Sequence, residues 1–372
     1  MDGCRGLAAL IVLFTHFFPL FYPAILWGRE YSHFANAADY LLGQRLPIPS
    51  AYSGVALFFI ITGFGTYTAM DAAKLDIRQY ILLRYFKLLV LTLLGALPVV
   101  ALLHFDLVFV ADIADSVKSP WFRDWPLPGL ALGQAIIHAP LSSLMEYNGV
   151  LWTMIYFFYG TLLSFILAKI FSSYWRTNLC ISLAVTLIFI NLEQYYYIPF
   201  IVGTCLAYFY KYHQKIFVSA ANANKKIIIS LVVLYLCSYP TGVVGPEGIF
   251  LSHDFERAYI PYNTVGAILF VIMVLMPGKL HQIMQGKLFQ WLGHYSMGIY
   301  LIHFPLVISL IAFFYKQLPE ALPYPVRISI ILVVYIACVI GASVPVQMVG
   351  DYLCRLLSML YRYVFTSNNQ LK

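Results

Sequence analysis

Apolar segments long enough to cross a lipid bilayer recur along the whole of this 372-residue chain. A helix rises about 1.5 Å per residue, so about 20 predominantly apolar residues span the hydrocarbon core. We identify ten such windows, of which the shorter ones lie near the lower limit of length: residues 6–27, 54–72, 86–110, 149–170, 177–192, 194–210, 226–240, 260–277, 295–315 and 326–347. Because every backbone polar group in lipid must be paired within the protein, the pattern predicts an all-α polytopic membrane protein of about ten transmembrane helices.

The composition agrees with this class of protein. The chain is 61% hydrophobic and only 10% charged, whereas a soluble domain carries about 25% charged residues. The charged side chains are too few and too dispersed for a nucleic-acid surface, so we expect the lipid bilayer as a partner and no nucleic acid. The six cysteines lie in or beside apolar windows without metal-ligand spacing, which predicts small core residues and neither a metal site nor a disulfide framework.

The domain prediction is a membrane-embedded domain over residues 1–350, then an interfacial helix and cytoplasmic tail over residues 351–372. The terminal segment LCRLLSMLYRYVF is amphipathic and supplies that helix. A signal peptide is the alternative for the N-terminus, because Ala35-Asn36-Ala37 fits a small-x-small cleavage site. The first window is longer than the hydrophobic region of a signal peptide, so we expect it to remain as a helix.

The distribution of lysine and arginine predicts the orientation. With the N-terminus in the cytoplasm, sixteen of the 23 basic residues fall in inside segments and seven in outside loops, which satisfies the positive-inside rule. The inside set is Arg5, Lys74, Arg78, Arg84, Lys87, Lys169, Arg176, Lys211, Lys215, Lys225, Lys226, Lys279, Lys287, Arg355, Arg362 and Lys372. The outside set is Arg29, Arg45, Lys118, Arg123, Arg257, Lys316 and Arg327. We therefore predict a multi-pass protein of a bacterial inner membrane with its N-terminus inside.

Arg5 and His16 lie eleven residues apart in the first window. Eleven residues turn a helix through about three full turns, so both side chains occupy one stripe, separated by roughly 16 Å along the axis. Arg5 would lie at one membrane face and His16 near mid-depth. Interhelical hydrogen bonding and headgroup anchoring are the structural alternatives. An ionisable side chain inside lipid indicates function, and a neutral imidazole there can act as a general base.

Other polar residues join this pair as candidates. His303 also lies within an apolar window, with Pro305 behind it to kink the helix, and either reacts or orients a partner. Arg84 and Lys87 follow the second window, and with Arg5 they would form a cytoplasmic basic mouth for a phosphate-bearing ligand.

Small and aromatic residues in two windows favour packing roles. Gly54, Gly63 and Gly65 interrupt the second window and predict close helix approach. Trp152 and Tyr156 in NGVLWTMIYFFYG are belt or core aromatics.

Together these segments resemble the acyltransferase family 3 membrane O-acyltransferases. DGCRGLAALIVLFTHF is similar to the family's opening helix, with its arginine, ten intervening residues and histidine. GVALFFIITGF, LLRYFK, LWTMIYFFYG and GHYSMGIYLIHFP are similar to later segments, in the family's order. The resemblance runs through nearly the whole chain.

The resemblance implies transfer of an acyl group, most often acetyl, from cytoplasmic acyl-CoA to a hydroxyl of a cell-envelope glycan or lipid-linked sugar. His16 would be the catalytic histidine, with His303 beside it, and Arg5, Arg84 and Lys87 would hold the donor. No metal is implied. The implied site-lining residues are Asp2, Thr62, Gly63, Trp152, Tyr156, Tyr295 and Ser296.

Two positions depart from the family pattern. Phe157 stands where the family usually has a glutamate, and Glu146 is an acidic neighbour in a predicted loop. The C-terminal acidic-x-Pro element is degenerate around Asp351.

Two functions remain as alternatives to the enzyme. A transporter or channel would use the buried histidines and arginines as a relay, although the windows contain few carboxylates. An inactive relative that scaffolds glycan assembly is the other, and the phenylalanine at position 157 favours it.

Overall fold

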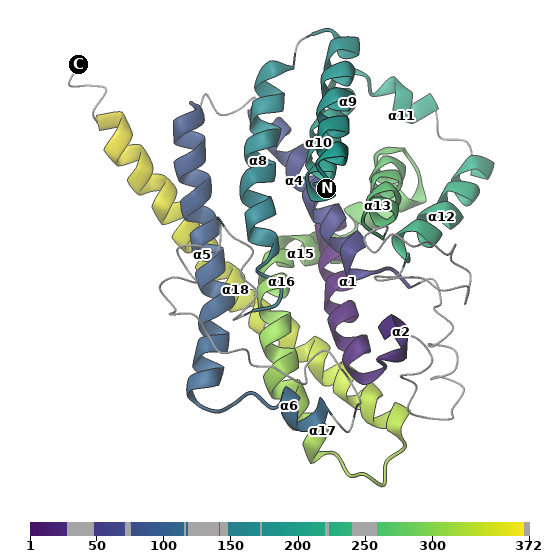
Figure 1. Ribbon diagram of the computed structural model, residues 1–372, viewed down its shortest axis with the longest axis vertical. Coiled ribbons are helices and arrows are strands. Elements are labelled where there is room, and N and C mark those ends of the chain that lie inside the picture. Colours follow the sequence, from purple (N-terminus) through teal and green to yellow (C-terminus); the bar gives the residue numbers. More distant parts are fainter. Residues whose placement is uncertain are drawn as a thin grey trace.

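Every regular element in the described part of the chain is helical (Figure 1). The computed structural model describes residues 1–27, 48–70, 76–114, 117, 141, 148–171, 173–219, 223–239 and 259–367, except the side chains of 26, 27, 114, 219, 223–225 and 362–367. The cleavage-like Ala35-Asn36-Ala37 and Glu146 lie outside these residues.

Each of the ten apolar windows overlaps one main helix. They are α1 (Asp2–Phe21), α4 (Ala51–Met70), α5 (Ile77–His104), α8 (Thr153–Ile170), α9 (Trp175–Asn191), α10 (Ile198–Tyr212), α12 (Ala223–Cys237), α13 (Tyr259–Leu275), α16 (Ser296–Leu306) and α18 (Tyr324–Ser367). Shorter helices are α2 (Ala24–Trp27), α6 (Val110–Ala114), the 3-10 turn Tyr195–Tyr197, α11 (Lys215–Ser219), α14 (Lys279–Gln285), α15 (Lys287–His294), the π-helical turn Val307–Ile311 and α17 (Ala312–Gln317).

Six helical segments of the described chain are long and apolar enough to cross a membrane, so the all-α class is confirmed and the predicted count of about ten is not. They are α1, α4, α5, α8, the segment Ser296–Gln317 and α18. α13 and α14 would make a seventh span, bent by 91° at their junction, while α9 and the apolar part of α12 are shorter. A hydrophobic window in the sequence predicts burial in lipid but does not fix helix length, and this is why the two counts differ.

α4 lies at the centre of the bundle, where it packs against α1, α8, α10 and α13. A Cβ on Gly63 would collide with the carbonyl of Phe200 in α10, and a Cβ on Gly203 would collide with the carbonyl of Ile60 in α4. Each helix thus presents a glycine to the backbone of the other. The close approach predicted from Gly63 is confirmed, because a side chain there would force the two helices apart.

α14 and α15 both pack on α1 near its start, at what we call the N-terminal end of the bundle. The end of α4 and the start of α5 lie at this same end, where their residues line one cavity together with Arg5. α15 packs on the first turns of α1, where a Cβ on Gly293 would collide with the backbone of Asp2. This contact fixes the height of α15 relative to Arg5.

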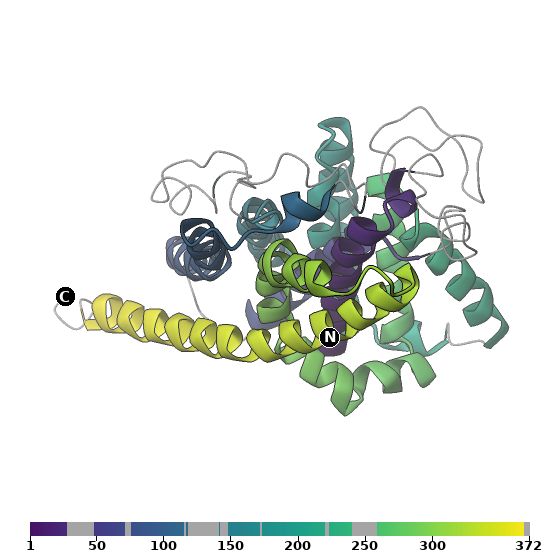
Figure 2. The same cartoon turned by 90° about the horizontal axis from the view of Figure 1, so that it is seen from below.

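α18 is one continuous helix of 44 residues and extends away from the bundle as a long arm that carries the C-terminus (Figure 2). No break separates the predicted domain 1–350 from the predicted interfacial helix, so the amphipathic segment continues the last apolar helix. Its position along a membrane surface stays a prediction.

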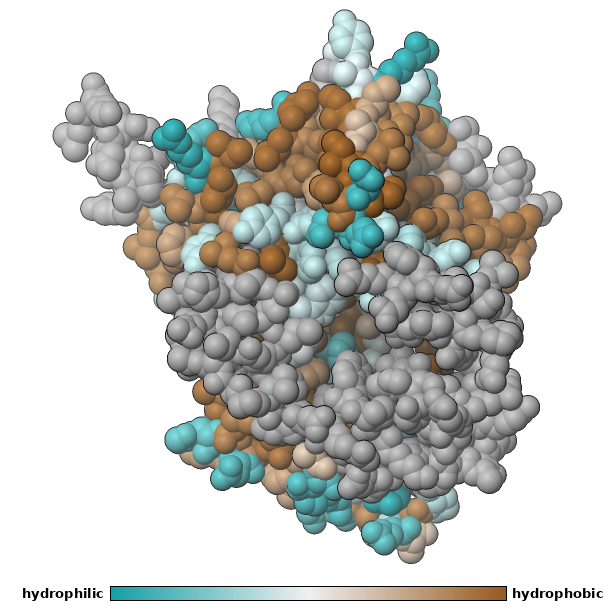
Figure 3. Space-filling model, in the orientation of Figure 1, coloured by the Kyte–Doolittle hydropathy of each residue, from teal (hydrophilic) through white to brown (hydrophobic). Residues whose placement is uncertain are grey.

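The described surface carries large hydrophobic areas. On the face shown in Figure 3, hydrophobic residues gather in the upper half, with hydrophilic residues above them and others along the lower edge. Large apolar side chains are exposed, including Leu187 and Ile188 on α9 and Leu231 on α12. These side chains are stable there only if lipid or another protein covers them.

Candidate active site

A cavity of about 430 Å³ opens at the N-terminal end of the bundle. Six helices line it: α1, α4, α5, α8, α16 and α18, together with the end of α15. Its polar lining includes Arg5, Thr62, Thr66, Arg84, His294, Ser296 and Gln347. The described lining contains two arginines and no carboxylate, so the cavity favours an anionic occupant.

Arg5 reaches the cavity from the first turn of α1. Its Nη1 donates to Asp2 Oδ1 at 3.0 Å, and both side chains are well exposed, so the ion pair is weak. A Cβ on Gly65 of α4 would lie 3.5 Å from Arg5 Nη2. That distance is an ordinary van der Waals contact, so Gly65 lies beside the guanidinium, whereas Gly63 on the same helix faces α10.

Arg84 enters the cavity from α5 and is held by a neutral group. Its Nε donates to Thr161 Oγ1 of α8 at 3.1 Å. The threonine hydroxyl in turn donates to a carbonyl of its own helix, 2.6 Å from Phe157 O and 2.9 Å from Phe158 O. No carboxylate of the described residues lies within ion-pair distance of Arg84, and both of its Nη groups keep their donors for a ligand.

Of the other residues predicted at the N-terminal end, some line the cavity and some do not. Thr62 and Ser296 line the cavity, with their hydroxyls bonded to Phe58 O and Gly293 O. Lys87 and Tyr295 are not among its lining residues, and the Tyr295 ring packs against Trp291 at 4.8 Å.

Phe157 lines the same cavity and is almost completely buried. Its ring meets Phe59 edge-on at 5.1 Å. Where the family usually has a carboxylate, this protein therefore has an apolar wall.

Sequence reasoning missed four polar residues of the cavity, namely Thr66, Tyr80, His294 and Gln347. Gln347 accepts a hydrogen bond from the Gly298 amide at 3.0 Å and donates to Asp351 Oδ1 at 2.9 Å, so the degenerate C-terminal element does contact the cavity wall. Thr161, which holds Arg84 but does not line the cavity, was missed as well. An amide inside the last apolar window was the signal that could have identified Gln347.

His16 and His303 meet in the interior of the bundle, beyond the cavity. Their ring centroids are 4.9 Å apart, with His303 Nε2 3.4 Å from His16 Nδ1. His303 is fully buried, and His16 is 8% exposed. The structure thus brings together two residues that are 287 positions apart and that were predicted independently from two apolar windows.

Backbone carbonyls fix the tautomers of this pair. His16 Nδ1 lies 2.8 Å from Val12 O, and His303 Nδ1 lies 3.1 Å from Ile299 O. A carbonyl only accepts, so we assign the ring hydrogen of each histidine to Nδ1. The Nδ1 hydrogen of His16 is then directed to Val12 O, with His303 Nε2 as a second and more distant acceptor at 3.4 Å, and the lone pair of His16 lies on Nε2.

Two aromatic rings stand between the cavity and the histidines. Phe58 lines the cavity and meets the ring of Tyr300 edge-on at 5.5 Å, and Tyr300 lies 5.9 Å from the ring of His303. Neither histidine lines the cavity itself.

Buried hydrogen bonds hold Tyr300 in place. Its hydroxyl donates to Val150 O at 3.0 Å and lies 2.9 Å from Thr153 Oγ1. The buried Asn148 amide links α5 and α16 by donating to Gly95 O and Leu301 O. This network also escaped sequence reasoning, because it depends on contacts between distant segments.

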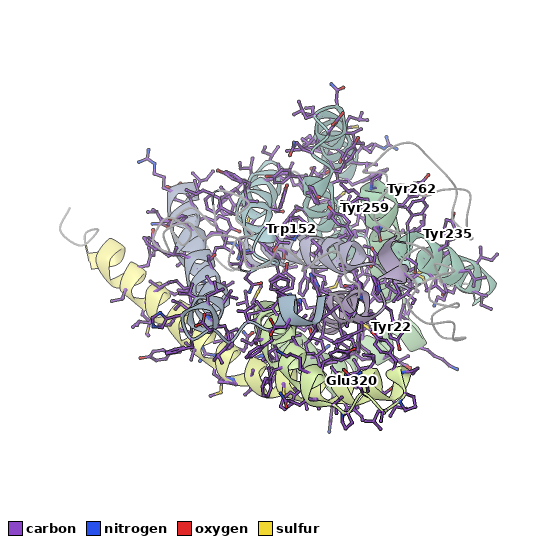
Figure 4. The ribbon with its side chains drawn as sticks, turned by 60° about the horizontal axis from the view of Figure 1, so that its bottom comes forward. Tyr22, Trp152, Tyr235, Tyr259, Tyr262 and Glu320 are labelled. Carbon is purple, nitrogen blue, oxygen red and sulfur yellow. The ribbon has the colours of Figure 1, made fainter. Side chains whose placement is uncertain are left out.

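Trp152 and Tyr156 belong to an aromatic cluster at the end of the bundle opposite the cavity. Tyr156 and Tyr196 have ring centroids 4.6 Å apart, and Trp152 packs on both. Trp152 and Tyr259 both contact Tyr52, and they lie close together in Figure 4. Both side chains are partly buried, and neither lines the cavity, so their site-lining role stays a prediction.

Within the described residues, no three histidine, cysteine, aspartate or glutamate side chains are placed to hold a metal ion.

Comparison with known proteins identifies the family. A family model described as an acyltransferase domain matches residues 1–344. No curated protein and no solved structure matches the chain. The match covers most of the chain, including the cavity-lining residues up to α16 and both histidines. The chain therefore belongs to this acyltransferase family, acyltransferase family 3, and the protein is a membrane acyltransferase.

Proposed function

We propose that this acyltransferase moves an acyl group, most simply acetyl, from cytoplasmic acyl-CoA to a hydroxyl of a cell-envelope glycan or lipid-linked sugar. The observation that carries the proposal is the cavity with two arginines and no carboxylate, situated below a buried histidine pair. Acyl-CoA carries several phosphate groups, and guanidinium groups bind phosphate through paired hydrogen bonds.

Arg5 and Arg84 would hold the phosphates at the N-terminal end of the bundle. The pantetheine arm would extend along α1, since His16 lies roughly 16 Å further along that helix. Phe58 marks the inner wall of the cavity, so this side chain must move for the thioester to approach the histidines. Lys87, which does not line the cavity, would contribute only long-range charge.

His16 would act as the general base through Nε2. Its lone pair takes the proton of the acceptor hydroxyl as the oxygen attacks the thioester carbonyl. The carbon–sulfur bond then breaks, and the CoA thiolate takes the proton from the imidazolium as it leaves. His303 would position His16 as a second acceptor of the Nδ1 hydrogen beside Val12 O, and both acceptors keep the lone pair on Nε2. A route through an acyl-histidine at position 16 uses the same residues.

The acceptor would approach from the end of the bundle opposite the arginines, where the aromatic cluster around Trp152 and Tyr156 lies. Tyrosine and tryptophan combine an apolar ring with a polar group, and this suits the mixed surface of a sugar.

The test compares cells that express His16→Ala with cells that express the wild type, after protein levels are matched. Mass spectrometry of surface glycans should lose the mass of one acyl group in His16→Ala. His104→Ala is the matched control, because His104 is an exposed histidine at the far end of α5. Full acylation by His16→Ala would overturn the catalytic role.

Binding of radiolabelled acetyl-CoA to the purified full chain tests the donor separately. The family match does not favour the transporter or channel. Saturable binding supports the enzyme, whereas absence of binding above background removes acyl-CoA as the donor.

A further inference from the structure

We infer that the cavity contains an adenine subsite, in which the ring of Tyr80 stacks on the base of the donor nucleotide. The inference rests on the proposed function, because it assigns one part of acyl-CoA to one part of the cavity. It starts from an aromatic pair next to Arg84 that the mechanism does not use.

Tyr80 of α5 and Phe165 of α8 both line the cavity and stack on one another. Their ring centroids are 4.2 Å apart, with an angle of 21° between the ring planes. Phe165 is 2% exposed and also has the Lys169 ammonium 5.6 Å from its centroid. Tyr80 is only half-buried, so its ring has exposed surface on which a base can stack.

The aromatic pair and the Arg84–Thr161 hydrogen bond are two successive contacts between α5 and α8. Tyr80 and Arg84 are four residues apart on α5, and Phe165 and Thr161 are four residues apart on α8. Residues at this spacing lie one above the other on a helix face. The Tyr80–Phe165 ring contact therefore lies one helical turn from the Arg84–Thr161 hydrogen bond.

This arrangement fits an adenosine phosphate. In such a molecule a single ribose separates the base from the phosphate. The base and the phosphate can therefore bind side chains that lie one helical turn apart, as Tyr80 and Arg84 do. The base would extend the Phe165–Tyr80 stack, and the phosphate would bind the Nη groups of Arg84. Nucleic-acid bases gain substantial affinity from stacking on aromatic side chains, whatever the base. The Lys169 ammonium adds a positive charge on the same side.

The alternative explanation is that Tyr80 and Phe165 only pack against each other, and it predicts that their loss has no effect on ligand affinity. Three substitutions distinguish base stacking from packing alone. Tyr80→Phe keeps the ring, Tyr80→Leu removes it, and Tyr85→Leu removes a ring of the same helix that does not line the cavity.

The experiment measures the affinity of the purified full chain for CoA, adenosine 3′,5′-bisphosphate and acetyl-pantetheine, which lacks the nucleotide. Tyr80→Leu should raise the Kd for CoA by roughly 5- to 100-fold, the range that base stacking supports. Tyr80→Phe and Tyr85→Leu should bind CoA like the wild type. Affinity for acetyl-pantetheine should be equal in all four proteins, and competition by the bisphosphate should require a higher concentration in Tyr80→Leu than in the three proteins that keep the ring.

The experiment distinguishes an error in the adenine subsite from an error in the proposed acyl-CoA donor. If the wild type binds CoA but Tyr80→Leu binds it equally well, or if the bisphosphate does not compete, the adenine subsite is wrong and the donor site stands. If the wild type binds neither CoA nor acetyl-pantetheine, the proposed donor is wrong and the subsite falls with it. A loss in Tyr80→Phe as large as in Tyr80→Leu would also overturn the stacking role, because it would assign the effect to the hydroxyl.

Discussion

At the scale of single residues, Arg84 shows how a charge is kept available inside an apolar bundle. Its Nε is bonded to the neutral hydroxyl of Thr161, so the guanidinium is oriented without being neutralised. A carboxylate in that position would compete with any anionic ligand. The phenylalanine at position 157, one turn from Thr161, fits this environment better than an acid would.

Arg84→Gln should raise the Kd for CoA by about 10- to 100-fold, since hydrogen bonds to a charged group contribute about 1.5–3 kcal/mol. Arg84→Lys should recover only part of the loss, because an ammonium cannot bind Thr161 and present a planar fork of donors together. Isothermal titration of the purified protein gives both values. Arg176→Gln removes an exposed arginine at the start of α9 and should bind like the wild type. Equal affinity of Arg84→Gln and Arg176→Gln would contradict the prediction.

His303→Ala should lower kcat by about 100-fold with little change in the KM for acetyl-CoA, because a misplaced base loses rate rather than donor affinity. His303→Gln retains an acceptor near His16 Nδ1 and should recover part of the rate. Steady-state kinetics at matched protein levels separate the two parameters. A proportional rise in KM, with no recovery in the glutamine variant, would count against a positioning role.

Much of the candidate site was predictable at this scale, for a physical reason. Arg5, His16, Arg84 and His303 are costly to place in lipid, so their presence in or beside apolar windows is informative. Thr161, Tyr300 and Asn148 carry no such cost, since a hydroxyl or an amide readily finds a carbonyl on a neighbouring helix. Their roles follow only from which helices are adjacent, and a single sequence does not specify that.

At the scale of helices, the contact between α4 and α10 depends on the reciprocal glycines 63 and 203. Gly63→Ala should lower the midpoint of thermal unfolding, because an added methyl meets backbone atoms that cannot move aside; overpacking of this kind costs about 1–3 kcal/mol. Gly341→Ala is the control, since a Cβ there meets nothing within 4 Å. It should raise the midpoint slightly through helix propensity. The measurement is thermal unfolding in detergent, and equal midpoints for the two variants would refute the packing argument.

The helices themselves followed from the sequence more securely than their ends did. α5 begins nine residues before the predicted window, at Ile77, because Asp76 and Gln79 form a capping box. Those residues are polar and therefore lie outside any hydrophobic window. α18 likewise continues past its window to Ser367 without a break. Hydropathy marks the part of a helix that prefers lipid, whereas caps and polar continuations decide where the helix ends.

At the scale of the whole molecule, the ends of the helices make the predicted orientation testable. Gln317 lies at the end of α17 and Gln214 just after α10, at opposite ends of the bundle, and both are exposed. In intact cells, Gln317→Cys should react with a membrane-impermeant thiol reagent, and Gln214→Cys should react only after permeabilisation. Cys180→Ser serves as the background and control, because Cys180 is the exposed native cysteine. The reverse pattern would place the arginine cavity on the outer side and exclude cytoplasmic acyl-CoA.

The aromatic side chains Phe58 and Tyr300 lie between the cavity and the histidine pair, and in the proposed mechanism this bears on how the enzyme would keep its donor intact. A thioester bound among the arginines would be out of reach of His16, so water would have no catalyst with which to attack it. Productive transfer would then require the acyl end to pass the two rings. In a resting cell without acceptor, the protein is therefore expected to behave as a reservoir of intact thioester and not as a thioesterase.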